Sequence, residues 1–161
     1  MFQIIRSYDE LDMEQLMHVY EQSNLKYGVS RCRNGSRWEQ LRIAEENLQE
    51  FVMDFMNIKG AMFATWSSEG RLTTVLRLEP YCDGYLLTGL ETAVDDRRRG
   101  YASALMSTTL QHISGRVYSH VEKRNLPSVA VHKKVGFTIA AEYAKLLDGT
   151  VSQFYYTMIA N

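Results

Sequence analysis

Residues 95–106 read Asp-Asp-Arg-Arg-Arg-Gly-Tyr-Ala-Ser-Ala-Leu-Met, a charged loop that turns through a glycine into an apolar helical pattern. The segment before it, 85–92, is strand-like, and the pattern continues to Ile113 at the three-and-four spacing of one helix face. A strand therefore ends, the chain reverses, and a helix N-terminus points its free N–H groups outward. Gly100 and Ala102 leave little side chain in the way of a ligand. The stretch predicts a binding site for an anion such as a phosphate.

A second polar segment follows at residues 117–137. Its first five residues alternate as a short strand, Pro127 suits the first turn of a helix, and Gly136 suits the residue that stops one. Ser128 and His132 are four residues apart, so they share a helix face, and Asn125 lies three residues before them. We expect this polar face to take part in a site.

Together the two segments resemble the GCN5-related N-acetyltransferase (GNAT) family. Arg97, Gly100 and Ala102 occupy the fixed positions of its coenzyme-binding loop, Gln/Arg-x-x-Gly-x-Gly/Ala. The second segment is similar to the family pattern at four positions and departs from it at His132, where the family usually has Tyr. The matching positions are Asn125, Ser128, Gly136 and Phe137.

The pattern of elements predicts an α/β (α+β) fold and a single domain spanning residues 1–161, in the order β-α-α-β-β-β-α-β-α-β-β. This order resembles the GNAT fold from end to end: a mixed, mostly antiparallel sheet with a central, splayed parallel strand pair, flanked by helices. Asp9 is expected to cap a helix ending near Gly28, with a polar connection over 24–35. Ser36 and Glu39 have capping-box spacing before a long helix. The predicted strands are 2–6, 61–66, 72–78, 85–94, 117–121, 138–147 and 151–159.

Composition restricts the class of protein. The formal net charge is −1 over 161 residues, which argues against a dedicated nucleic-acid or membrane-surface protein. Cys32 and Cys82 have no paired spacing, so neither a disulfide scaffold nor a metal site is predicted. The N-terminal residues lack a secretory pattern, and no apolar run approaches a membrane span. We expect a cytoplasmic protein, a monomer or a homodimer, with no nucleic-acid or membrane partner.

The resemblance implies how a coenzyme would bind. In that fold the strand ending near residue 92 and the strand 117–121 run parallel and splay apart, and the amide chain of pantetheine fills the gap. The backbone of 92–94 would contact pantetheine, the amides of 97–103 the pyrophosphate, and the second segment the coenzyme arm. The implied coenzyme-binding residues are Thr92, Ala93, Val94, Arg97, Arg98, Arg99, Gly100, Tyr101, Ala102, Ser103, Asn125 and Ser128.

Three residues are candidates for catalysis. His132 stands where the family has the Tyr that is commonly proposed to protonate the departing thiolate, and an imidazolium donates a proton at least as easily as a phenol. His120 lies at a strand position that supplies a Glu base in some family members. Glu91 is the other carboxylate close to the expected thioester. We rank His120 above Glu91 as the base, and the alternatives are a packed His120, a Glu91 in a surface ion pair and a His132 that only satisfies a hydrogen bond.

The resemblance implies an acyl-CoA-dependent N-acyltransferase that moves an acetyl group from acetyl-CoA, as co-substrate, to a primary amine by direct transfer without a metal. The acceptor is expected to bind near residues 20–38 and 145–152. The alternative is a non-catalytic module that holds an acyl coenzyme, and only the replaced Tyr favours it.

Overall fold

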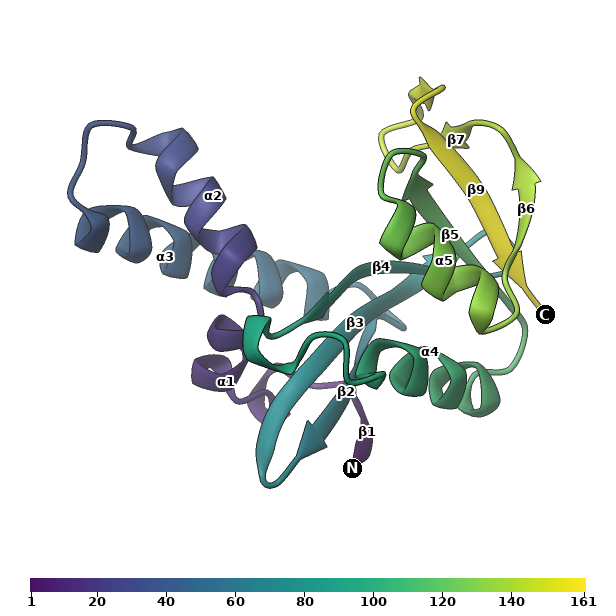
Figure 1. Cartoon of the computed structure of the whole chain (residues 1–161), viewed down its shortest axis with the longest axis horizontal. Coiled ribbons are helices and arrows are strands. Elements are labelled where there is room, and N and C mark those ends of the chain that lie inside the picture. The colour runs from purple at the N-terminus through teal and green to yellow at the C-terminus, as the bar shows by residue number, and fades with distance from the viewer.

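The computed structural model covers residues 1–161 and contains a seven-stranded sheet in the order β1-β2-β3-β4-β5-β9-β6 (Figure 1). Neighbouring strands are antiparallel except for β4 and β5, which are parallel. A separate two-stranded ribbon pairs β7 with β8. The strands are β1 Phe2–Ile5, β2 Met62–Ser68, β3 Arg71–Tyr81, β4 Gly84–Thr92, β5 Arg116–Glu122, β6 Thr138–Ala141, β7 Ala144–Lys145, β8 Val151–Ser152 and β9 Tyr155–Ala160.

Helices cover both faces of the sheet. Helices α4 and α5 pack on one face, where Leu105 and Val129 join the apolar residues of β2 to β5. Helices α1 and α3 pack on the other face through Leu16, Val52 and Phe55. In Figure 1, α2 and α3 form a hairpin that extends away from the sheet. None of the helices has the length and apolar character needed to cross a membrane. The helices are α1 Met13–Val19, α2 Glu21–Arg31, α3 Arg37–Met56, α4 Tyr101–His112 and α5 Leu126–Lys134, with 3-10 turns η1 Tyr8–Glu10 and η2 Val94–Asp96.

The parallel pair separates partway along its length. Its pairing runs from Gly84 opposite Arg116 to Leu87 opposite Ser119, and no pair follows. Strand β4 nevertheless continues to Thr92 and β5 to Glu122. The predicted splayed pair is therefore confirmed, and the gap beyond Leu87 leaves polar backbone without a partner strand.

The helical region before β2 differs from the prediction. Asp12, not Asp9, caps the first helix, because its carboxylate accepts a hydrogen bond from the Gln15 N–H at 3.1 Å. The helix breaks at Tyr20, and α2 then passes through Gly28 and the predicted polar connection. Gly28 is a packing residue, since a Cβ there would lie 2.1 Å from the Gln40 carbonyl oxygen of α3. The predicted end of the helix near Gly28 is therefore wrong, because α2 continues to Arg31. The capping box of Ser36 and Glu39 is confirmed.

The two C-terminal strands are each interrupted. The sheet pairing of β6 shifts register between Ile139 and Ala141, and the chain then leaves the main sheet to form β7. Asp148 accepts bonds from the Thr150 N–H at 2.9 Å and hydroxyl at 2.7 Å, which forms the predicted turn. The prediction of two continuous strands is wrong here, because the parts next to the turn leave the main sheet and form the short ribbon of β7 and β8.

Candidate active site

The predicted anion site is the N-terminus of α4. Gly100 precedes this helix with φ of 85°, and no side chain caps the helix. The first helical backbone bond runs from the Ala104 N–H to the Gly100 carbonyl at 3.0 Å, so the amides before Ala104 have no helical partner. A Cβ built on Gly100 meets nothing within 4 Å. The amides therefore face open space, where the helix dipole favours an anion.

The three arginines of the loop have different partners. Arg97 donates to the Gln22 side chain at 2.8 Å and to the Thr92 carbonyl at 3.2 Å. Arg99 pairs with the buried Asp96 at 3.3 Å. Arg98 lines the pocket and takes part in no ion pair. Arg98 is thus the available cation of the loop, while Arg97 ties the loop to α2.

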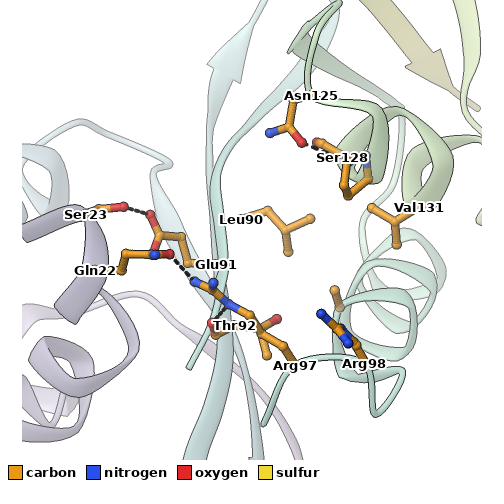
Figure 2. A pocket seen from close by; sticks show the side chains of 12 residues that line it. Gln22, Ser23, Leu90, Glu91, Thr92, Arg97, Arg98, Asn125, Ser128 and Val131 are labelled. Carbon is orange, nitrogen blue, oxygen red and sulfur yellow. Dashed lines mark hydrogen bonds between the residues drawn. The ribbon is translucent and has the colours of Figure 1, made fainter. Parts of the chain in front are cut away.

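A pocket of about 630 Å³ opens beside the loop, between the end of β4, α5 and α2. In Figure 2, Glu91 and Arg97 lie beside α2, and Asn125, Ser128 and Val131 lie across from them. A smaller pocket of about 280 Å³ continues along the loop to α4. These two pockets are lined by most of the predicted coenzyme-binding residues, namely Thr92, Arg97, Arg98, Gly100, Tyr101, Ala102, Ser103, Asn125 and Ser128.

Three of the predicted coenzyme residues lie elsewhere. Ala93 is completely buried in the core that α1 and α3 cover, and its N–H donates to the Thr73 carbonyl at 2.9 Å. Val94 is exposed in the turn η2. Arg99 lines a neighbouring pocket with Asp96. Whether these residues contact a coenzyme stays a prediction.

The gap between β4 and β5 contains a cavity of about 160 Å³. It is lined by all three candidate catalytic residues, His120, His132 and Glu91, together with Ser119. Fold and packing thus bring residues from β4, β5 and α5 to one place. No three His, Cys, Asp or Glu side chains are grouped so as to hold a metal ion.

His132 is buried, and both of its ring nitrogens have protein partners. Nδ1 lies 2.7 Å from the Ser128 carbonyl oxygen, which only accepts, so Nδ1 carries a proton. Nε2 lies 2.9 Å from the Ser119 hydroxyl. Burial lowers the pKa of His132, against the raising effect of the Ser128 carbonyl. The ring is therefore neutral at pH 7, and Nε2 accepts from Ser119.

His120 lies on the opposite face of β5 and differs in its contacts. Its ring packs edge-on against Tyr81, with 5.6 Å between ring centroids. Nε2 is buried and has no hydrogen-bond partner. Burial lowers the pKa of His120, so the ring is neutral at pH 7 and free to accept a proton.

Glu91 lies on β4 beside α2 and accepts a hydrogen bond from the Ser23 hydroxyl. Burial raises the pKa of Glu91, while the Ser23 bond and three cations, Arg97, Arg77 and Lys26, oppose the shift. A carboxylate with a raised pKa is a better proton acceptor than an exposed one. Glu91 is not in a surface ion pair.

Several residues of the site were not among the residues predicted individually from the sequence. Ser119 carried a usable signal, because strand alternation places it on the α5 face, opposite Tyr118 and His120. Gln22 and Ser23 lie within residues 20–38, the region expected to bind the acceptor, and α2 brings both side chains to the pocket. The remaining pocket residues that were missed are Leu90, Pro127 and Val131.

Comparisons with known proteins agree with this geometry. A family model described as the acetyltransferase (GNAT) family matches residues 33–137. No curated protein sequence matches the chain.

Solved structures show the same fold. The PaiA N-acetyltransferase of Thermoplasma acidophilum, in complex with coenzyme A, is similar with a TM-score of 0.67 at 13% identity, covering 100% of this chain and 99% of that one. An aminoglycoside 6'-acetyltransferase type Ii gives a TM-score of 0.69 at 13% identity, covering 100% and 96%. The ribosomal-protein-S18-alanine N-acetyltransferase of Escherichia coli gives 0.62 at 15% identity, covering 99% and 92%.

Proposed function

This chain belongs to the GNAT acetyltransferase family, and from that premise we propose that it is an N-acetyltransferase that moves an acetyl group from acetyl-CoA directly to a primary amine. One observation carries the proposal. The unpaired gap beyond Leu87 leads into the uncapped N-terminus of α4, and pockets line the whole path. An extended amide chain ending in a pyrophosphate matches this path, because the gap pairs with amides and the helix end with phosphates.

Coenzyme binding is assigned to the loop and the gap. The amides before Ala104 bind the pyrophosphate, and Arg98 adds charge beside them. The thioester then lies in the cavity between β4 and β5, within reach of the three candidate catalytic residues. Asn125 remains on the α5 side of the coenzyme arm, where its side chain accepts from the Ser128 N–H at 3.2 Å.

In the reaction, the amine nitrogen attacks the thioester carbonyl, a C–N bond forms, and the C–S bond breaks. The proton lost by the amine passes to His120, whose Nε2 has no partner, with Glu91 as the second candidate. The thiolate leaves with the pair of electrons from the C–S bond and takes a proton from His132 or from water. Because a thiol has a pKa of about 8.5, its departure needs little assistance at neutral pH.

His132 can deliver a proton to the thiolate only if its hydrogen bonds change. The ring must carry a proton on Nε2, and Ser119 must then turn its hydroxyl to the Leu87 carbonyl, which lies 3.3 Å away. Burial lowers the pKa of His132 and makes this protonated form the minor one at pH 7. Assistance by His132 is therefore expected to increase as the pH falls.

The occupied nitrogens of His132 also favour the second candidate function, a module that holds an acyl coenzyme without turnover. Release of free coenzyme thiol separates the two. Purified protein is incubated with acetyl-CoA and a panel of amines: amino acids, polyamines, an aminoglycoside and a peptide with a free N-terminus. Amine-dependent thiol release supports the transferase. Saturable binding in a calorimetric titration without release for any amine supports the module.

A further inference from the structure

Arg77 of β3 is a cation without an anionic partner. Its guanidinium carbon lies 4.4 Å from the ring centroid of Phe51, 5.7 Å from that of Phe55 and 6.0 Å from that of Tyr20. It takes part in none of the ion pairs, and its Nε is buried without a hydrogen-bond acceptor. Aromatic faces compensate only part of the cost of desolvating a charge. The guanidinium is therefore a site that an anion would complete.

The side chain lies over β4 at Gly89, a residue that lines the cavity between β4 and β5. Arg77 pairs with Thr88, just after a register shift in which β4 bulges. A Cβ on Gly89 would lie 2.6 Å from Nε and from Nη2, so the guanidinium lies directly across β4 at Gly89. Gly89 has φ of 56°, and its carbonyl accepts from the Tyr20 hydroxyl at 2.8 Å. The cation is held at Gly89, two residues beyond Leu87, the last residue of β4 that pairs with β5.

The same face of the sheet carries the candidate bases. Tyr81, four residues after Arg77 on one face of β3, packs against His120. Burial raises the pKa of both Glu79 and Glu91, and Arg77 opposes the shift in each case. Neither carboxylate comes within ion-pair distance of the guanidinium. A ligand held by Arg77 on this face has the gap, and the thioester expected in it, directly beside it.

We propose that Arg77 binds a carboxylate of the acceptor, so that the acceptor is a small amino acid whose free carboxylate lies close to the reacting amine. The inference rests on the proposed function, since it assigns the acceptor of the same site. A guanidinium matches a carboxylate with two parallel hydrogen bonds. With its carboxylate on Arg77, the acceptor's amine reaches the gap between Glu91 and His120. Peptide N-termini, whose carboxylate is far from the amine, do not meet this requirement.

The test compares matched acceptors. Thiol release is measured for a series of L-amino acids and for their carboxamides, which keep the amine and side chain but lose the charge. We expect kcat/KM to favour the acid over its amide by roughly tenfold to hundredfold, the usual contribution of a charged hydrogen-bonded pair. Arg77→Met, which retains apolar contact with Phe51, is expected to bring this ratio close to one. Arg77→Lys is expected to retain part of it.

Arg42 provides the matched control, because it also lies over an aromatic ring, Trp38, at 5.9 Å, but on the outer surface of α3. Arg42→Met is expected to leave the ratio unchanged. The inference is overturned if the acid-to-amide ratio of kcat/KM is near one in the wild type, or if Arg77→Met retains the wild-type ratio. If Arg77→Met does not fold, the comparison of acids with their amides in the wild type still tests the inference. Thiol release confined to amines without a carboxylate overturns it while sparing the proposed function, and no release with any amine removes both.

Discussion

The proposed coenzyme side and the proposed acceptor side of this site are built in different ways. On the coenzyme side, one continuous stretch supplies the loop, the positive-φ glycine and the uncapped amides of α4. On the acceptor side, Arg77, Glu91 and His120 come from three strands, and Ser23 comes from a helix far away in the sequence. Backbone recognition needs a local conformation, whereas side-chain recognition needs a tertiary arrangement. The two sides should therefore respond differently to substitution.

The largest effect is expected from the base on the acceptor side. His120→Gln removes the proposed proton acceptor, and turnover should fall by about 10²–10⁴-fold. A base works only when unprotonated, so activity is lost as pH falls through its pKa. The pKa of His120 is lowered and that of Glu91 is raised, so the pH at which activity falls does not by itself identify the base.

The pH profiles of wild type, His120→Gln and Glu91→Gln are therefore measured with one good acceptor. Loss of the acidic limb in His120→Gln alone would assign the base to His120. Loss in Glu91→Gln alone would assign it to Glu91. An unchanged limb in both variants would mean that the amine arrives already deprotonated.

The next largest effect is expected on the coenzyme side. Gly100→Val places a β-branched side chain at a φ of 85° and in the open space beside the amides. Coenzyme affinity should fall roughly hundredfold, since several charge-assisted hydrogen bonds are lost. Calorimetric titration with acetyl-CoA measures the change.

Gly149→Val is the control for backbone strain, because Gly149 also has an open position and a φ of 86°. It should lower stability by a similar amount and leave coenzyme affinity unchanged. Equal affinity in Gly100→Val and wild type would contradict the assignment of the α4 N-terminus.

A smaller effect, on stability, is expected at the contact of His132 with Ser119 and Ser128. His132→Phe leaves the Ser119 hydroxyl and the Ser128 carbonyl without the ring, and the free energy of unfolding should fall by about 1–3 kcal/mol. The control is His112→Phe, because His112 makes the same contact to a carbonyl four residues earlier, at 2.8 Å, on the surface. That change should stay within about 0.5 kcal/mol.

The pH dependence of stability tests the same contact. The folded-state pKa of His132 is lowered, so the unfolded chain binds more protons and stability falls as pH drops through about 6.5, the unfolded value. Urea unfolding of the wild type is measured at several values between about pH 7.5 and about pH 5.5, on either side of the unfolded-state pKa. The free energy of unfolding should fall across this range. His132→Phe should show a smaller fall, and an identical pH dependence would count against a buried neutral ring.

The smallest effect is expected where α2 meets β4. Ser23→Ala removes the hydrogen bond that lowers the pKa of Glu91, so that pKa should rise further. If Glu91 is the base, the acidic limb of activity moves to higher pH, and if His120 is the base it stays in place. Ser30→Ala, on the same helix with its hydroxyl bonded to the Tyr27 carbonyl, is the control.

The sequence predicted much of the fold because its signals are local. The capping box at Ser36, the spacing around Gly100 and the alternation of β5 each depend on neighbours a few residues away. The prediction failed at Gly28, where a glycine meets the carbonyl of Gln40 from another helix. A glycine that stops a helix and one that admits a second helix look the same in a sequence.

For the site, the sequence by itself determined the conformation of the loop that we propose binds the coenzyme, because the motif, the turn and the helix end lie in one stretch. Only the tertiary structure decided that the Ser119 hydroxyl contacts His132, while His120 keeps a nitrogen without a partner. It also brought Arg77 across Gly89, next to the gap. These facts depend on which face of a strand a residue occupies and which helix covers that face. Burial and pairing of this kind follow from long-range packing, which no local pattern records.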